Sequence, residues 1–400
     1  MATKRTFVPD IQIMPSGVDD DSLRAALQGD PAGTVKRLMA SEDFRWENVR
    51  SLQRFFDLTY DTKVPTQAMI GGKMRAVTTA AFPLLTGGMT AVALNEAYAG
   101  VPTIGEMLVT DTDTNKKVSE FAAITSHDTT IDRVDEGKDF PEMAAGEERV
   151  EIRQLRNGRR LSITAETLEE NDVPGLIDRI NQLGETAAEF VEEQTLSRVT
   201  DLNGSTASAA EPYAYRPNGA GTALYSASAN TPGTRAPSGT RVNSNPLVDE
   251  TDLDNAKAVL VAMKNSRGKR ISNPISSCQL LVPSALQGTA FKLLGSEDQP
   301  GVTNELNAWG PRGINRPTIV SSPKMDDLST TTWYLGDFPR QFKRVWRLRF
   351  EYVTLGADTE SYLRARIAAQ FRIAWSCEVG ATDYVRVVQN LTATTAPVPS

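Results

Sequence analysis

One long amphipathic helix, predicted for residues 173–201, constrains the fold more than any other feature. Asp172 precedes it as a candidate N-cap, and Pro174 is tolerated in a first helical turn. Apolar side chains recur at helical spacing at Val173, Leu176, Ile177, Ile180, Leu183, Ala187, Val191 and Val199. At 1.5 Å per residue this helix would be about 43 Å long, whereas the mean helix has about 11–12 residues. A helix of this length must pack along a broad surface.

The C-terminal third of the chain supplies such a surface as predicted β-strands. Residues 345–352 place aromatic and aliphatic side chains on one parity and mainly charged ones on the other, the period of a strand. A second apolar stripe occupies alternate positions at Ile367, Ala369, Phe371, Ile373 and Trp375. Residues 384–388 are predicted to close the same sheet. We interpret these stripes as core.

A basic β-hairpin is predicted just before the long helix. Its two strands alternate apolar and polar residues at Val150, Ile152, Leu161 and Ile163. Asn157-Gly158 between them is the pair that a tight type I′ turn prefers. Residues 116–124 are predicted as an outgoing strand, so residues 118–163 would form a two-stranded projection. Such a ribbon is marginally stable alone, which indicates that it packs on something else.

The net charge of the chain argues against general binding to nucleic acid. The chain has 43 basic and 50 acidic residues and a net charge of −7. A basic run over residues 340–349, with Trp346 inside it, could suggest nucleic-acid contact. Its period-two pattern puts Arg347 and Arg349 opposite the aromatic residues, which favours a structural strand with a charged outer face.

The cysteines and apolar stretches exclude two further classes. Cys278 and Cys377 lie far apart in predicted strands, so we expect both to be buried and reduced rather than part of a disulfide framework. No secretory signal is visible near the N-terminus. Residues 76–94 are uncharged, but Pro83 and Gly87-Gly88 interrupt them, so no membrane span is predicted.

Catalysis has little support in the sequence. The single histidine, His127, lies between Ser126 and Asp128, but adjacent residues do not make a catalytic triad. One histidine and two scattered cysteines are also too few for a zinc site. We therefore predict no catalytic, cofactor-binding or metal-binding residues, and expect His127 in an exposed loop.

Several segments, in order, resemble tailed-phage major capsid proteins with the Hong Kong 97 fold. Residues 156–172 and the long helix look like the end of that family's extended loop and its spine helix. Later segments are similar to its axial and closing elements: residues 280–286, 291–294, 332–337, 371–375 and 383–388. The Pro-x-Ala that often precedes the last strand is replaced by Ala381-Thr382-Asp383. The resemblance covers about residues 88–391.

The resemblance implies an α+β fold with an N-terminal arm, an extended β-hairpin loop, a peripheral domain with a spine helix and antiparallel sheet, and an axial α+β domain. Residues 203–248 are rich in small residues and proline, which indicates a flexible surface insertion. The expected division is 1–75 N-terminal arm, 76–117 helix and lead-in, 118–163 extended loop, 164–202 peripheral domain, 203–248 insertion, 249–339 axial domain, 340–391 closing strands of the peripheral domain and 392–400 disordered tail.

The function implied by the resemblance is that of a structural, non-enzymatic protein. It would self-assemble as hexamers and pentamers into the icosahedral head of a tailed bacteriophage, in the host cytoplasm, without cofactor or membrane. Expected partners are portal and scaffold or protease during assembly, and double-stranded DNA enclosed without sequence-specific binding. Neighbouring subunits are expected to contact Phe140, Met143, Arg149, Arg153 and Arg156. Some relatives cross-link from a lysine near the position of Lys138, but no partner motif is visible, so no cross-link is predicted.

Three alternatives stay open. An encapsulin-type nanocompartment shares the fold and encloses enzymes, and neighbouring genes for a terminase and portal or for a cargo enzyme would separate the two. A hydrolase of unknown substrate would lose its activity in His127→Ala. A soluble binding module would be a stable monomer with a compact ligand pocket.

Overall fold

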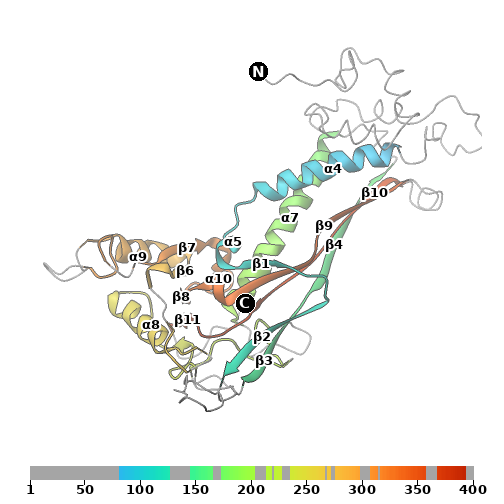
Figure 1. Ribbon diagram of the computed structural model, residues 1–400. Coiled ribbons are helices and arrows are strands. Elements are labelled where there is room, and N and C mark those ends of the chain that lie inside the picture. Colours follow the sequence, from blue (N-terminus) through green and yellow to red (C-terminus); the bar gives the residue numbers. More distant parts are fainter. Residues whose placement is uncertain are drawn as a thin grey trace, which may run out of the picture. The chain divides into compact units, whose positions relative to one another are not determined.

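The computed structural model of the chain contains helices and sheets in comparable amounts (Figure 1). It describes residues 81–126, 145–164, 173–202, 213–218, 220–227, 235–265, 268–271, 275–297, 307–313, 316–356 and 367–392. The predicted arm, His127, Lys138, Phe140, Met143 and Asp172 lie outside these residues. The α+β class expected from the sequence is confirmed.

The described helices follow the sequence patterns closely. The helix predicted for 173–201 is α7, a helix of 28 residues. The α-helices are α4 (Ala81–Gly100), α5 (Gly105–Leu108), α7 (Val173–Thr200), α8 (Glu250–Ala262), α9 (Ser284–Gly295) and α10 (Phe338–Gln341), and the short 3-10 helices are η2 (Ile275–Ser277) and η3 (Pro323–Met325). No described helix is long and apolar enough to cross a membrane.

The strands within the described residues form three sheets. They are β1 (Thr110–Asp113), β2 (Val118–Ser126), β3 (Ala145–Arg153), β4 (Leu155–Thr164), β5 (Arg241–Val242), β6 (Gln279–Pro283), β7 (Thr318–Ser322), β8 (Trp333–Gly336), β9 (Phe342–Gly356), β10 (Ile367–Ala381) and β11 (Val387–Asn390). Their orders are β1-β9-β10-β4, β5-β11-β8-β6-β7 and β2-β3. The β2–β3 pair is antiparallel, and we call it the ribbon.

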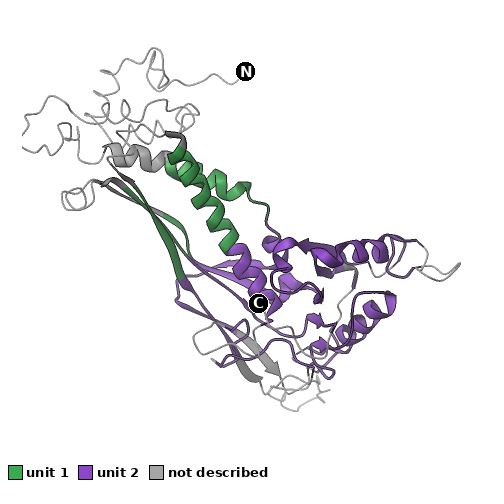
Figure 2. Cartoon of the chain, turned by 180° about the vertical axis from the view of Figure 1, so that it is seen from behind, with its two compact units in different colours: residues 1–102, 156–190, 348–375 green, residues 103–155, 191–347, 376–400 purple. Residues whose placement is uncertain are grey.

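Two compact units can be distinguished (Figure 2). Unit 1 comprises residues 1–102, 156–190 and 348–375, and unit 2 comprises residues 103–155, 191–347 and 376–400. The elements α7, β9 and β10 therefore each have residues in both units.

Unit 1 packs helices and strands through their apolar faces. Gly184 of α7 lies so close to α4 that a Cβ there would meet Ala97 Cβ and the Leu94 carbonyl oxygen at 2.8 Å each. On the strands, the Phe350 and Trp375 rings lie 5.3 Å apart, and the burial of Phe371, Ile373 and Trp375 confirms that this part of the second predicted stripe is core. Apolar burial of this kind contributes about 25 cal/mol per Å², so it offsets the ordering of the long helix.

Unit 2 is built on the five-stranded sheet. Its inner strand β6 buries four of five residues, as expected for a strand covered on both faces. Helix α8 begins with a capping box in which the Asp249 side chain accepts from the backbone N–H of Asp252 and Asp252 accepts from that of Asp249. The apolar stripe of this helix, Leu253, Ala256 and Leu260, is buried.

The turn predicted at Asn157-Gly158 is wrong. Both residues lie inside the continuous strand β4, and neither has a positive φ. A Cβ on Gly158 would meet the Ile373 carbonyl oxygen at 2.5 Å, so this glycine permits close pairing with β10 rather than a turn. The hairpin is formed by β2 and β3 instead, and residues 155–163 of the expected extended loop belong to the four-stranded sheet.

Two further expectations need correction. Residues 384–388 were predicted to close the sheet of Trp346 and Phe371, but β11 pairs with β8 and β5 in the five-stranded sheet because the chain turns after β10. The insertion 203–248 was expected to be a flexible excursion, yet Tyr215, Leu224 and Tyr225 in its described part are at most 4% exposed. A few large side chains thus pack a segment whose average composition is that of a linker.

Two glycine-to-alanine substitutions test the packing of α7. Gly184→Ala should destabilise the protein by about 1–3 kcal/mol because the added methyl group overpacks the contact with α4. Gly288→Ala in α9, where nothing lies within 4 Å, should stabilise it by about 0.5–1 kcal/mol because alanine is the better helix former. Urea denaturation measures both changes, and equal effects of the two variants would contradict the close helix contact.

Candidate functional site

The ribbon carries two of the predicted intersubunit residues. Arg149 and Arg153 lie on one face of β3, and their side chains are 55% and 51% exposed. Arg149 lies 3.4 Å from Glu120 and Arg153 lies 3.3 Å from Glu151. The Arg149–Glu120 pair is exposed on both sides and contributes about 0–1 kcal/mol, so an acidic group of another subunit could replace Glu120 at little cost.

The opposite face of β3 anchors the ribbon in its own subunit. Val150 and Ile152 are 1% and 2% exposed, so the alternation predicted for this strand is confirmed. Gln154 Nε2 donates to Ser119 Oγ at 3.0 Å, and Lys343 Nζ lies 4.6 Å from the centre of the Phe121 ring. The base of the ribbon is therefore fixed, whereas its nine-residue strands reach about 30 Å at 3.3 Å per residue.

The third predicted residue, Arg156, lines a groove on unit 1. The groove has a volume of about 410 Å³ and is lined by Arg156, Asn157, Gly158 and Arg159 of β4, Leu183, Thr186, Ala187 and Phe190 of α7, and Trp375 of β10. Arg156 is 60% exposed and lies 3.3 Å from Glu351. Because β4 is the outermost strand of its sheet, its far edge has no neighbouring strand among the described residues.

Two buried donors of the groove have no acceptor among the described residues: Asn157 Nδ2 and Trp375 Nε1. Phe190 at its rim is 42% exposed although it is aromatic. A groove with cationic side chains and an exposed aromatic ring fits an extended acidic segment that brings an apolar anchor.

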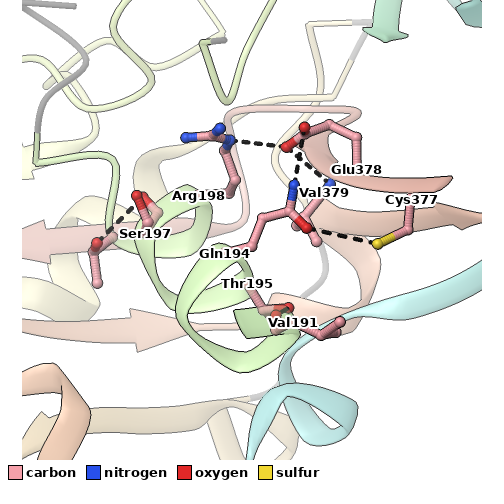
Figure 3. A network of polar contacts seen from close by, with 9 residues as sticks. Val191, Gln194, Thr195, Ser197, Arg198, Cys377, Glu378 and Val379 are labelled. Carbon is pink, nitrogen blue, oxygen red and sulfur yellow. Dashed lines mark hydrogen bonds and ion pairs between the residues drawn. The ribbon is translucent and has the colours of Figure 1, made fainter. Parts of the chain in front are cut away.

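A buried polar network joins α7 to β10 within unit 2. Figure 3 shows Gln194 and Arg198 pointing from α7 toward Glu378. Arg198 Nε lies 2.9 Å from Glu378 Oε1, and Gln194 Nε2 donates to Glu378 Oε2 at 3.0 Å. Burial raises the pKa of Glu378, and the Arg198 guanidinium opposes that shift. The neighbouring Cys377 thiol contacts Gln194.

The two cysteines are free and buried, as predicted. Burial raises the pKa of the Cys278 thiol and of the Cys377 thiol to about 12 in each case. Both thiols are therefore protonated at neutral pH and are poor nucleophiles. Within the described part of the chain, no cluster of three or more His, Cys, Asp or Glu residues could hold a metal ion.

The C-terminal end of α7 is enclosed by side chains that sequence reasoning missed. The Tyr225 hydroxyl donates to the Val199 carbonyl at 2.9 Å, and the Tyr334 hydroxyl donates to the Thr200 carbonyl at 3.0 Å. Asp201 follows the helix, and its Oδ2 accepts from the Leu224 N–H at 2.7 Å. No local motif reports such contacts, because the partners lie 23–134 positions apart in the chain.

The basic run at residues 340–349 is structural at its buried end. Arg344 makes two hydrogen bonds to the Asp111 carboxylate, at 2.7 and 3.0 Å, and its side chain is 7% exposed. A guanidinium engaged in this way is not available to a phosphate backbone. Arg347 and Arg349 are exposed, as the predicted strand pattern requires.

Comparison with known proteins identifies the family. The profile of a family described as "Phage capsid protein" matches residues 147–390, more than half of the 400-residue chain. The chain belongs to this family. It is a structural protein of a phage capsid, as the sequence resemblance implied. A comparison with curated proteins gave no match.

Similar solved structures are also capsids or particles. A capsid of a native GTA particle shares 11% identity over 74% of this chain and 92% of that chain, with a TM-score of 0.47. The capsid of cyanophage P-SCSP1u shares 13% identity over 72% and 88%, with a TM-score of 0.44. A virus-like particle from Pyrococcus furiosus shares 8% identity over 75% and 97%, with a TM-score of 0.43.

The buried network of Figure 3 predicts a strong effect of removing one partner. Arg198→Met should destabilise the capsid protein by about 3–5 kcal/mol because it leaves the Glu378 carboxylate buried without its cation. The double variant Arg198→Met with Glu378→Gln removes the charge as well and should recover most of this loss. Arg179→Met, on the exposed face of the same helix, is the control and should change stability by less than about 0.5 kcal/mol. Denaturant titration measures all three, and a double variant no more stable than Arg198→Met would contradict the assignment.

Proposed function

We propose that this phage capsid protein forms hexamers and pentamers that close into an icosahedral shell around double-stranded DNA. The main support for this proposal is the structure of the ribbon. Beyond its base, where Val150 bridges Pro217, no other named strand among the described residues joins its two strands, and a two-stranded ribbon is marginally stable without further contacts. A neighbouring copy supplies such contacts, and repeated heterologous contacts that close produce rings and shells.

The remaining parts take roles consistent with this assembly. The four-stranded sheet with α7 is the peripheral domain, and the five-stranded sheet with α8 and α9, now including β11, is the axial domain. Assembly takes place in the host cytoplasm with portal and scaffold or protease. The protein has no enzymatic step of its own, and its net charge of −7 suits DNA that is enclosed without being gripped.

The groove on unit 1 is the surface that best fits the ribbon of a second copy. The sequence between β2 and β3 contains Phe140 and Met143 together with the acidic residues Asp135, Glu136, Asp139 and Glu142. The groove offers Arg156, Arg159 and the exposed Phe190 ring. Opposite charges and matching apolar groups thus support a contact between this segment of one copy and the groove of another. Phe140, Met143 and Arg156, all predicted at the subunit interface, would take part in it.

Electron microscopy of the full chain, expressed with its assembly partners, tests the proposed function. We expect closed shells with pentameric and hexameric units that contain DNA after packaging. Shells filled with a protein cargo and no DNA would support the nanocompartment alternative. A stable monomer under all assembly conditions would refute shell formation by this chain.

Neighbouring arginines of β4 test the groove. Arg159 lines it, whereas Arg160, also exposed, does not. Arg159→Glu should lower the rate or yield of shell assembly at least about tenfold, because like charges brought together across an interface cost several kcal/mol. Arg160→Glu changes the net charge equally and should assemble as the unmodified protein does. Light scattering follows both reactions, and circular dichroism verifies that each variant folds. Equal assembly of the two variants would show that the groove is not the contact surface.

A further inference from the structure

The end of α7 holds a carboxyl group in an unfavourable place. Asp201 has φ of 41° and directly follows the last helical residue, so its side chain lies at the negative end of the helix dipole. The residue is only partly exposed, and protein atoms closely surround its carboxyl group. Ionisation of this group is therefore opposed by desolvation and by the helix carbonyls.

The charged and titratable groups around Asp201 come from four elements. Arg198 of α7 is the nearby cation, but it is already paired with Glu378 of β10 at 2.9 Å. The other two groups are the buried phenols of Tyr225, in the insertion, and Tyr334 of β8, and burial raises the pKa of each. Two carboxyl groups thus depend on a single guanidinium, and the phenols remain neutral.

Part of the insertion closes over this helix end. We call residues 213–218 and 220–226 the clasp. The backbone N–H groups of Leu224 and Ala214 donate to the Asp201 carboxyl group, the former at 2.7 Å. Leu224 and Tyr225 are 0% and 4% exposed. The clasp therefore covers Asp201 and loses its closest polar anchor if it opens.

The same clasp also holds the base of the ribbon. Asn218 donates its backbone N–H to the Arg149 carbonyl at 2.6 Å, and Glu151 donates its own to the Arg216 carbonyl at 3.1 Å. Val150 and Pro217 form an antiparallel bridge between these bonds. Ala381 donates to the Ala214 carbonyl at 2.8 Å, which ties the clasp to the end of β10.

We propose that protonation of Asp201 holds the clasp closed over the end of α7, and that ionisation loosens the clasp together with the base of the ribbon. The clasp thus responds to protonation within one subunit. Its consequence for assembly rests on the proposed function, because the angle of the ribbon matters only where the ribbon meets a second copy.

The direction of the pH effect follows from the closed state. Burial raises the pKa of Asp201 from its ordinary value of 3.8 to about 7, although the hydrogen bond from Leu224 and the charge of Arg198 oppose the shift. The closed clasp thus binds a proton more tightly than the open, hydrated one. Closure is most stable below pH 4, weakens as pH rises toward 7 and changes little above it.

Hydrogen exchange of the unassembled full-length chain between pH 5 and pH 8 tests whether the clasp opens when Asp201 ionises. After correction for the intrinsic exchange rate, protection of the clasp amides and of residues 149–151 should fall by up to about tenfold per pH unit from pH 5 to 7, and level off by pH 8. Asp201→Asn should show high protection without this pH dependence. Asp178→Asn, on the exposed face of α7, should behave as the unmodified chain.

A second variant distinguishes pH-dependent opening of the clasp from a general loss of its stability. Tyr225→Phe removes the hydrogen bond to the Val199 carbonyl but no titrating carboxyl group. It should lower protection at every pH by a similar factor and keep the pH dependence. The proposal is overturned if Asp201→Asn retains the pH dependence of the unmodified chain, or if Tyr225→Phe abolishes it. Because the readout is local and precedes assembly, this failure is distinct from an absence of shells in electron microscopy.

Discussion

The carbonyl groups at the C-terminal end of α7 require hydrogen-bond donors, and other parts of unit 2 supply them. The last carbonyl groups of any α-helix lack intrahelical partners, and leaving them buried without donors costs about 1–3 kcal/mol each. Here the helix ends inside protein, where the Tyr225 and Tyr334 hydroxyls donate to the Val199 and Thr200 carbonyls. Gln389 of β11 in turn donates to the Tyr334 hydroxyl at 3.1 Å. The helix end, the insertion and the five-stranded sheet therefore form one connected polar and aromatic cluster.

Periodic features of the fold could be predicted because their cause is local. The spacing of Leu176, Ile180 and Ala187 determines which face of α7 is buried, and the alternation of Val150 and Ile152 determines the inner face of β3. The turn at Asn157-Gly158 was mispredicted because the same glycine also suits a close strand contact, in this case with Ile373. Local turn preference cannot tell these two uses of glycine apart, since only the tertiary partner decides between them.

The insertion and the groove show a second limit of sequence reasoning. Composition averages over a segment, so the buried Leu224 and Tyr225 are hidden among the small residues around them. The groove draws on β4, α7 and β10, and the sequence pointed only to its arginines, not to the α7 and β10 side chains beside them. Asn157 and Trp375 in this groove carry buried donors without an acceptor among the described residues, which is a property of the folded chain alone. The Phe140 and Met143 predictions, in contrast, used only the family resemblance.

A shell built from one sequence needs parts that stay rigid and parts that adjust, and the polar chemistry of this chain separates them. Separating Arg198 from Glu378, or Arg344 from Asp111, would leave the buried Glu378 or Arg344 side chain without its counter-ion, so these pairs fix the sheets and the helix. The ribbon base is held differently, by backbone hydrogen bonds to residues 216–218 and by two apolar side chains. Contacts of that kind can shift slightly without leaving an uncompensated ion. A change of conformation between non-equivalent positions in a closed shell therefore costs the least free energy where the ribbon leaves the clasp. It costs the most along α7.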